Sequence, residues 1–410
     1  MGDWLGRTIE LDVTNIAHGG VSVARHDGRV VFVADAIPGE RVLARVSSDS
    51  KKSFWRAETV EVLEASPHRQ PHVWDAAALD RDPVDRAGGA EFGHIELAHQ
   101  RELKRQVITD SLARMARIER DVTVEVVPGD DDRAGTGWRT RVRLHVDDQG
   151  RPGPFAARSH RVIPVTSLPL ATAELEASAP LGERFDGYES VDVLNPSTGG
   201  VRLIVGNQKP SVITERVGER EFRLADSGFW QVHRGAAATL TEAVQSAIDP
   251  ELFDPHAANL DLYGGVGLLA AAVADRFGPS TRITSVESDA TATDFAAENL
   301  SEWLGARAET GRVERWVAAL AASAGPSERE RLARATVVLD PPRAGAGRDV
   351  VEAVARVKPA QVVYVACDPV AFARDTALFA DLGYHLGGLR AFDLFPHTHH
   401  VEAVGTFTRT

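Results

Sequence analysis

Beyond Phe229 the sequence alternates between short apolar runs and stretches whose apolar residues recur at helical spacing, and this alternation limits the possible folds more than any other feature. Strands that alternate with helices form a parallel sheet covered on both faces. We therefore expect an α/β domain over 227–410, with a Rossmann-like, doubly wound sheet. The pattern predicts helices over 230–248, 266–276, 289–304, 346–356 and 369–382, and strands over 258–263, 281–287, 335–340, 360–366, 384–393 and 400–408.

Residues 1–65 have a different pattern, with short alternating apolar and polar runs that glycines separate. This pattern is typical of a small β-barrel resembling an OB fold. A basic and aromatic loop, KKSFWR, contains Lys51, Lys52, Phe54 and Trp55. Two interpretations stay open: the loop holds a nucleic-acid backbone and stacks a base, or the aromatic residues are core and the lysines face solvent.

The range 66–226 predicts a mostly β central domain. Its first part, up to Glu96, is rich in Pro, His, Asp and Gly and should be irregular. A helix is expected over 97–120, and short strands follow from Asp121 to about Phe222.

The composition excludes several classes of protein. Hydrophobic residues make up 43% and charged residues 26%, and no apolar run approaches the roughly 18–20 residues of a membrane span. With no signal peptide visible at the start, we expect a cytoplasmic protein. A single cysteine, Cys367, excludes a disulfide framework, a Cys-rich zinc site and an all-cysteine iron–sulfur cluster, and is either a core filler or a nucleophile. The net charge of −13 means that any RNA-binding surface must be a local patch.

The first site-like motif is a glycine turn after strand 258–263, DLYGGVGLLA, which contains Gly265 and Gly267. Such a turn lets a ligand approach the backbone at the carboxyl edge of a sheet. A dinucleotide fingerprint would need a third glycine in register, which is missing. Glu287 ends the next strand, where a carboxylate can accept hydrogen bonds from ribose hydroxyls. S-adenosylmethionine and NAD both suit this pattern, and a purely structural turn is the alternative.

Two further predicted strands end in side chains that could take part in a reaction. Asp340 follows an apolar strand in VLDPPRAGAG, and Asp-Pro-Pro after such a strand is typical of a loop on which methyltransferases grip a flat base; a rigid Pro-rich turn is the alternative. Cys367 ends the next strand, directly before Asp368 as a helix N-cap. The helix N-terminus favours a thiolate while the Asp368 carboxylate opposes it, and the sequence leaves that balance open. The place of Cys367 beside the Asp340 strand favours a nucleophile over an inert core cysteine.

The segment AFDLFPHTHHVEAV contains His397, His399 and His400. We predict no metal site there, because no further set of His, Cys or carboxylate residues accompanies them at ligand spacing. Glu402 lies in the apolar strand that follows, either paired structurally or serving as a base with a raised pKa. Gln231, expected at the start of helix 230–248, offers both a donor and an acceptor unless it is a buried structural amide.

These motifs together resemble the S-adenosylmethionine-dependent RNA 5-methyluridine methyltransferases, over nearly the whole chain. FWQVH, DLYGGVGLLA, VLDPPRAGAG, YVACDPVAFARD and FPHTHHVEAV match that family's motifs in order and spacing. The N-terminal barrel resembles a TRAM domain, an RNA-binding module. WRTRVRLHV and GPFAARSHRVIPVTSLPLA resemble the family's central domain, which implies RNA contacts by Arg139, Arg141, Arg143 and Arg158 and helix 97–120 folded onto the C-terminal domain.

The resemblance also implies roles for single residues. Cys367 would be the nucleophile, Glu402 the general base, Asp340 a contact to the cofactor or the uracil edge, and Gln231 a contact to cofactor and base. Phe229 or Trp230 would stack on the target base. Tyr263, Gly265, Gly267, Leu268 and Glu287 would line the cofactor pocket, and Lys51 and Lys52 of the barrel would contact RNA. Ala87 and Ala90 stand where two cysteines of a family iron–sulfur cluster would fall, so no cluster is expected.

The predicted function is methyl transfer from S-adenosylmethionine to C5 of a uridine in structured RNA, either tRNA or rRNA, through a covalent bond from Cys367 to C6. No obligate protein partner is implied. Methylation of RNA cytosine at C5 is an alternative, because it shares the thiolate addition. A second alternative is an RNA-binding or chaperone-like protein that has lost catalysis.

Overall fold

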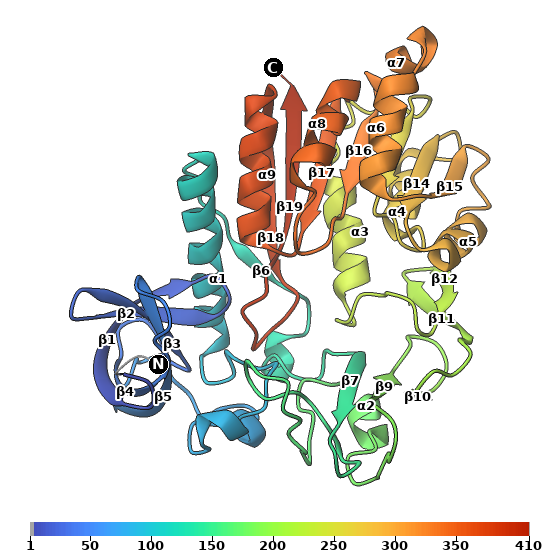
Figure 1. Ribbon diagram of the computed structural model, residues 1–410. Coiled ribbons are helices and arrows are strands. Elements are labelled where there is room, and N and C mark those ends of the chain that lie inside the picture. The colour runs from blue at the N-terminus through green and yellow to red at the C-terminus, as the bar shows by residue number, and fades with distance from the viewer. Residues whose placement is uncertain (1–3, 410) are drawn as a thin grey trace.

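The computed structural model describes residues 4–409, in which a small barrel and a central domain both lie below the edge of a large C-terminal sheet (Figure 1). This arrangement confirms the expected α/β fold with an N-terminal barrel and a mostly β central domain. Within the described range, no helix has the length and apolar character that a membrane crossing requires.

The N-terminal barrel closes in the strand order β1-β2-β3-β5-β4. Its interior is filled by the alternate residues that face inward, among them Leu11, Val31 and Trp55. The two aromatic residues of the KKSFWR loop therefore differ. Trp55 belongs to the barrel core, whereas Phe54 is half-buried beside Phe32 on the surface. The strands are β1 (Thr8–Ala17), β2 (Val21–His26), β3 (Arg29–Ala34), β4 (Arg41–Ser48) and β5 (Phe54–Glu64).

The chain then runs through a mostly irregular segment to helix α1 (Leu97–Ser111), which ends in a π-helical turn (Leu112–Ala116). The helix expected over 97–120 is therefore too long. It stops because Arg117 adopts a left-handed conformation with φ 58°, after which strand β6 (Val124–Val126) joins the C-terminal sheet beside β18. Helix α1 packs against helix α9 of the C-terminal domain, as Figure 1 shows.

The central domain is built on short strands around a core that contains Trp138, Leu144 and Val193. Four of its strands form a sheet in the order β10-β9-β7-β8, and β11 and β12 form a separate hairpin. The elements are β7 (Arg141–Val146), β8 (Pro152–Gly153), α2 (Ala173–Ser178), β9 (Ser190–Leu194), β10 (Arg202–Val205), β11 (Val212–Val217) and β12 (Arg220–Ala225).

The C-terminal sheet has eight strands in the order β15-β14-β13-β16-β17-β19-β18-β6. The first five are parallel to their neighbours, and β19 pairs antiparallel with β17 and β18. The strands are β13 (Asn259–Leu262), β14 (Ile283–Glu287), β15 (Ala306–Thr310), β16 (Thr336–Leu339), β17 (Gln361–Ala366), β18 (Tyr384–Asp393) and β19 (Glu402–Arg409). The helices are α3 (Ala236–Ala247), α4 (Leu268–Phe277), α5 (Ala290–Asn299), α6 (Val313–Ser323), α7 (Pro326–Leu332), α8 (Gly347–Val357) and α9 (Pro369–Asp381).

Two predicted helix boundaries in this domain are wrong. The helix expected over 230–248 begins only at Ala236, so Gln231 lies in the loop before it. That loop is extended because it pairs with the central domain, where Thr140 N donates to Val232 O at 2.8 Å. The helix expected over 289–304 ends at Asn299. Strand β15 and helices α6 and α7 lie in a range for which the periodicity gave no assignment.

Candidate active site

The predicted site residues meet at one edge of the C-terminal sheet. Strand β13 has β14 on one side and β16 on the other, so the strand order reverses at β13. In open α/β sheets, ligands bind at the carboxyl ends of the strands at such a switch point. The carboxyl ends of the parallel strands β13, β14, β16 and β17 carry, in that order, Tyr263, Glu287, Asp340 and Cys367. Strand β19 runs the other way and therefore begins at this edge with Glu402.

The register of β17 and β19 brings the cysteine and the glutamate together. Ala366 pairs with Ala403 at the end of the antiparallel ladder. Cys367 follows Ala366 and Glu402 precedes Ala403, so the two occupy the next position on adjacent strands.

The glycine turn between β13 and α4 is folded as a ligand cradle requires. Gly264 has no room for a side chain, since a Cβ there would lie 1.9 Å from Ser285 Oγ. Gly265 and Gly267 have positive φ angles of 54° and 91°, and no atom lies within 4 Å of a Cβ built on Gly265. The face of Gly265 is therefore open. The pocket beside it is lined by Phe229, Trp230, Gln231, Leu240, Tyr263, Gly264, Gly265, Val266, Leu268, Leu269 and Asp340.

The donor set of this pocket fits a nucleoside without a pyrophosphate. Glu287 accepts hydrogen bonds from Gly265 N at 3.2 Å and from Asp289 N at 2.9 Å, which fixes its carboxylate beside the glycine turn. Leu268 and Phe229 offer apolar surface, and no Lys or Arg is among the described residues that line the pocket. A pyrophosphate would lack a cation there, whereas a sulfonium cofactor would meet carboxyl groups.

Cys367 is partly exposed, between the end of β17 and the start of α9. Burial raises the pKa of its thiol to about 12, and the charges of Glu402 and Asp340 add to the rise. Arg343 lowers the pKa of Cys367, and Asp368 raises it further. In the free protein, burial and the neighbouring carboxyl groups therefore favour the protonated thiol, against the effect of the helix N-terminus beside it.

The two carboxyl groups beside the cysteine are also perturbed. Burial, with the nearby Asp261 charge, raises the pKa of Asp340 to about 7. Burial and the Asp340 charge raise the pKa of Glu402 well above its ordinary value. Glu402 is 5% exposed and takes part in none of the ion pairs found over residues 4–409, which does not favour the interpretation of a structural pair.

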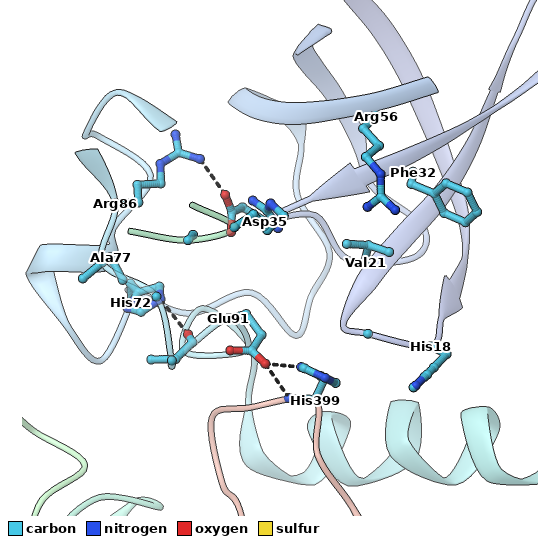
Figure 2. A pocket seen from close by; sticks show the side chains of 17 residues that line it. His18, Val21, Phe32, Asp35, Arg56, His72, Ala77, Arg86, Glu91 and His399 are labelled. Atoms are coloured by element: carbon cyan, nitrogen blue, oxygen red, sulfur yellow. Dashed lines mark hydrogen bonds and ion pairs between the residues drawn. The ribbon is translucent and has the colours of Figure 1, made fainter. Parts of the chain in front are cut away.

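The thiol opens into a cavity of about 110 Å³ beneath the barrel. That cavity is lined by Ala17, His18, Gly19, Gly20, Phe92, Leu103, Lys104, Val107, Arg343, Cys367, Asp368, Pro369, His399 and His400. Through His18, Gly19 and His399 it borders a larger cleft of about 440 Å³, which Figure 2 shows between the barrel and the segment around Glu91. Cys367 therefore lines a small cavity that shares three of its lining residues with the cleft under the barrel.

Comparisons with known proteins agree with this geometry. A tRNA (uracil-5-)-methyltransferase family model matches residues 254–409, and a TRAM domain model matches residues 4–60. An uncharacterized RNA methyltransferase of Streptomyces avermitilis is 37% identical over 440 residues, covering 98% of both chains. One from Streptomyces coelicolor is 36% identical and covers 98% of this chain and 92% of its own. The chain belongs to the S-adenosylmethionine-dependent RNA uracil-C5 methyltransferases.

A solved structure supports the fold of this methyltransferase. The Pyrococcus abyssi tRNA (uracil-54, C5)-methyltransferase, in complex with S-adenosyl-L-homocysteine, aligns with a TM-score of 0.69 at 20% identity. The alignment covers 98% of this chain and 100% of that one. The barrel, central domain and sheet thus occur together in the same arrangement in a remote relative.

The histidines of the methyltransferase have separate roles. His397 is buried and structural, since it accepts from Gln100 Nε2 at 3.0 Å and donates through Nε2 to Ala134 O at 2.8 Å. His399 hydrogen-bonds Glu91, and His400 Nε2 lies 3.2 Å from Arg343 Nη2.

The prediction that no carboxylate accompanies the histidines at ligand distance is wrong. Glu91, His399 and His400 bring possible ligand atoms within 4.8 Å of one another, although Glu91 lies far away in the sequence. A cation there would stand beside the Arg343 guanidinium, which opposes its binding. The absence of a metal stays a prediction.

The four predicted arginines of the central domain differ in burial and in the groups that they contact. Arg139 and Arg141 are half-buried and donate to Arg141 O and Gly228 O at 3.0 and 2.7 Å. Arg143 is exposed and held by both carboxylate oxygens of Asp192, each at 2.7 Å. Arg158 lines the larger cleft in an ion pair with Glu58 of the barrel. Their contacts to RNA stay predictions.

The remaining predicted RNA-facing residues are accessible. Lys51 and Lys52 are exposed in the loop before β5, and Phe229, which is 73% exposed, lines the pocket beside the glycine turn. Ala87 and Ala90 are buried in an apolar cluster with Trp74 and Ala156, so apolar packing holds that segment. That no iron–sulfur cluster binds stays a prediction.

Sequence reasoning missed several residues of this site. Arg343 could have been found, because it directly follows the two prolines of the Asp340 motif. His18, Lys104 and Glu91 gave no signal, because each lies in a segment far from the catalytic motifs along the chain. Lys104 of α1 anchors the loop before Glu402 by a buried ion pair with Asp393 at 2.5 Å.

Proposed function

We propose that this methyltransferase modifies C5 of a uridine in structured RNA through a transient covalent bond between Cys367 Sγ and C6 of the base. The observation that carries the proposal is the placement of Cys367 and Glu402 at adjacent strand ends, beside Asp340 and next to the cofactor pocket. A nucleophile and a base on opposite strands of one ladder suit a ring that must be attacked and then deprotonated.

The chemistry explains why these residue types are needed. Uracil C5 is a poor nucleophile, but addition of the Cys367 thiolate to C6 moves the electron pair of the C5–C6 double bond to C5 and O4, giving an enolate. S-adenosylmethionine, when bound, would supply a methyl group on a positively charged sulfur. A bond from the activated C5 to that methyl group would break the methyl–sulfur bond, and the sulfur would keep the electron pair in the neutral thioether S-adenosylhomocysteine. The ring then carries both a methyl group and a proton at C5.

Glu402 completes the reaction in this proposal by taking the C5 proton. The C–H electron pair re-forms the C5–C6 double bond, the C6–S bond breaks, and Cys367 leaves as a thiolate. A carboxylate with a raised pKa is a stronger base, and a positioned base typically contributes roughly 10²–10⁴ in rate. Asp340, with a pKa of about 7, can donate or accept a hydrogen bond at the uracil edge.

The residues that would hold the cofactor are those of the glycine turn and its neighbours. Glu287 would accept from the ribose hydroxyls, Gly265 would let the nucleoside approach the backbone, and Gln231 would offer its amide. Leu268 and Tyr263 would pack on the adenosine.

The substrate in this proposal is a uridine turned out of its stack, because C5 and C6 are out of reach inside a helix. In this proposal the RNA strand follows the larger cleft past Arg56 and Arg158 toward the smaller cavity that Cys367 lines. Exposed Phe229 is placed to stack on a base. The RNA is tRNA or rRNA, and we place the enzyme in the cytoplasm with it.

The decisive experiment uses RNA that contains 5-fluorouridine, from which the base cannot remove fluorine. Incubation with S-adenosylmethionine should give a covalent protein–RNA adduct with wild type and none with Cys367→Ala. Tritium release from 5-tritiated uridine but not from 5-tritiated cytidine in RNA identifies the base. Release from cytidine alone would replace uracil by cytosine, and no adduct with any cellular RNA would favour a protein that has lost catalysis. Mapping 5-methyluridine in RNA with and without the gene then identifies the target.

A further inference from the structure

The hairpin between β1 and β2 of the barrel forms part of the wall around Cys367. His18, Gly19 and Gly20 at its tip line the cavity that contains the thiol. Gly20 is tightly seated, because a Cβ on it would lie 2.7 Å from His399 Cβ, and its φ of 73° also favours glycine. The hairpin therefore touches the loop that leads to Glu402.

The same hairpin also touches the residue that follows the nucleophile. His18 Nε2 lies 2.9 Å from Asp368 Oδ2. Because an ionised carboxylate only accepts hydrogen bonds, Nε2 carries the proton in this contact. The other oxygen, Asp368 Oδ1, accepts from Val370 N at 3.0 Å and Ala371 N at 2.8 Å and so caps helix α9. Both oxygens of Asp368 are committed, one to α9 and one to the barrel.

We propose that His18 is a positioning residue for the methyl transfer: from the barrel, it holds Asp368 and offsets the negative charge of Asp368 beside the Cys367 thiol. The inference rests on the proposed function, since it concerns the reactivity of the same cysteine. It gives the barrel a second role besides holding RNA, because only a seated barrel completes the surroundings of the nucleophile.

The charges around Cys367 make such an offset useful. Asp368 is among the groups whose charge raises the pKa of Cys367, together with Glu402 and Asp340. A hydrogen bond from His18 withdraws charge from Asp368 and so reduces its share of that rise. The other titratable or charged groups lining the small cavity or its border with the cleft are Lys104 of α1, Arg343 after β16, Glu91, and His399 and His400 before β19.

A double-mutant cycle tests the proposal with the full-length enzyme. His18→Ala, Asp368→Asn and the double variant are compared for the rate of adduct formation with 5-fluorouridine RNA at saturating RNA and cofactor, from pH 6 to 9.5. The His18→Ala variant should form adduct about tenfold more slowly at pH 7.5, with its pH profile moved to higher pH, which corresponds to about one pKa unit in the thiol. In the Asp368→Asn background, where no charge needs offsetting, the same change should alter the rate by less than about twofold.

Matched variants separate positioning from folding and from RNA binding. His18→Gln keeps an N–H donor and should retain most of the wild-type rate. His256→Ala is the control, because His256 is exposed and precedes β13, whose opposite end carries the site. RNA affinity, measured by filter binding, should change by less than about twofold in all variants.

Two results would overturn the inference. One is an adduct rate for His18→Ala equal to wild type across the pH range. The other is the same loss in both backgrounds without a moved pH profile, which would mean that His18 only supports the structure. If wild type itself forms no adduct, the proposed function fails, and that outcome is recognised before any variant is compared.

Discussion

The edge of the C-terminal sheet and the cleft beneath the barrel differ in charge. The edge carries acids at its strand ends, namely Glu287, Asp340, Asp368 and Glu402. The cleft carries the guanidinium groups of Arg56, Arg86 and Arg158, two of which are neutralised by Asp35 and Glu58. Arg56 makes no ion pair within the described part of the chain, and stacks on Phe32 instead, 5.9 Å from its ring centre. In a chain with a net charge of −13, the sheet edge thus gathers carboxyl groups, whereas the cleft, which Asp35 and Glu91 also line, offers a guanidinium without an ion pair among residues 4–409.

The largest effect that tests this difference between edge and cleft is expected on removal of Cys367, the proposed nucleophile. Cys367→Ala should lower methylation by at least about 10³-fold, because no other group can activate C5 by addition at C6. RNA affinity should stay the same, since the proposed phosphate and base contacts lie in the cleft. The measurements are methyl incorporation from labelled cofactor and filter binding of the same RNA. Parallel loss of methylation and RNA binding would contradict the separation of edge and cleft.

A smaller but more informative effect is expected at Glu402, the proposed general base. Glu402→Gln should slow turnover by roughly 10²–10⁴ while leaving addition of Cys367 to C6 possible. Methylated RNA bound covalently to the protein should therefore accumulate with an ordinary uridine substrate. Denaturing gels with labelled methyl groups would detect it. A variant that turns over slowly without any adduct would place Glu402 before the addition step and remove it as the base.

The catalytic edge could be predicted from the sequence, and the cleft could not, for one physical reason. Asp340 and Cys367 each follow an apolar strand directly, and the carboxyl ends of neighbouring parallel strands share one edge, so local motifs place both. The contacts of His18 with Asp368 and of Glu91 with His399 join segments about 300 residues or more apart. No period or spacing in the sequence records such contacts.

The electrostatic state of the site was equally out of reach of the sequence. The N-terminus of α9 at Cys367 was visible, and it favours a thiolate. The raised pKa of the thiol depends on burial and on Glu402 and Asp340, which come close only in the folded sheet. The start of α3 at Ala236 was misplaced for a similar reason, since pairing of Val232 with Thr140 overrides the local helical pattern.

The RNA side of the comparison is tested by a pair of arginines. Arg56→Ala should weaken RNA binding a few-fold and reduce the slope of log affinity against log salt by about one, because an exposed guanidinium without a carboxylate partner is free for a phosphate. Arg143→Ala is the matched change, since Asp192 already holds that guanidinium. Filter binding over a salt series distinguishes them. Equal slopes for both variants would move the RNA path away from the barrel.

The smallest expected effect concerns stability at the acidic edge. The pKa of Asp340 is raised to about 7 from an ordinary value of 3.8, so the folded protein holds this proton more tightly than the unfolded chain does. The stability that the bound proton contributes is complete below about pH 4 and is lost as the pH rises toward about 7. Asp340→Asn, which stays neutral, should therefore match wild type at pH 4 and melt about 2–4 °C higher at pH 8. Asp294→Asn on the exposed face of α5 is the control for removing a carboxylate. A melting temperature that falls at pH 8 would mean that Asp340 is ionised and well solvated in the free enzyme, and that the acidic edge carries its full charge before any cofactor binds.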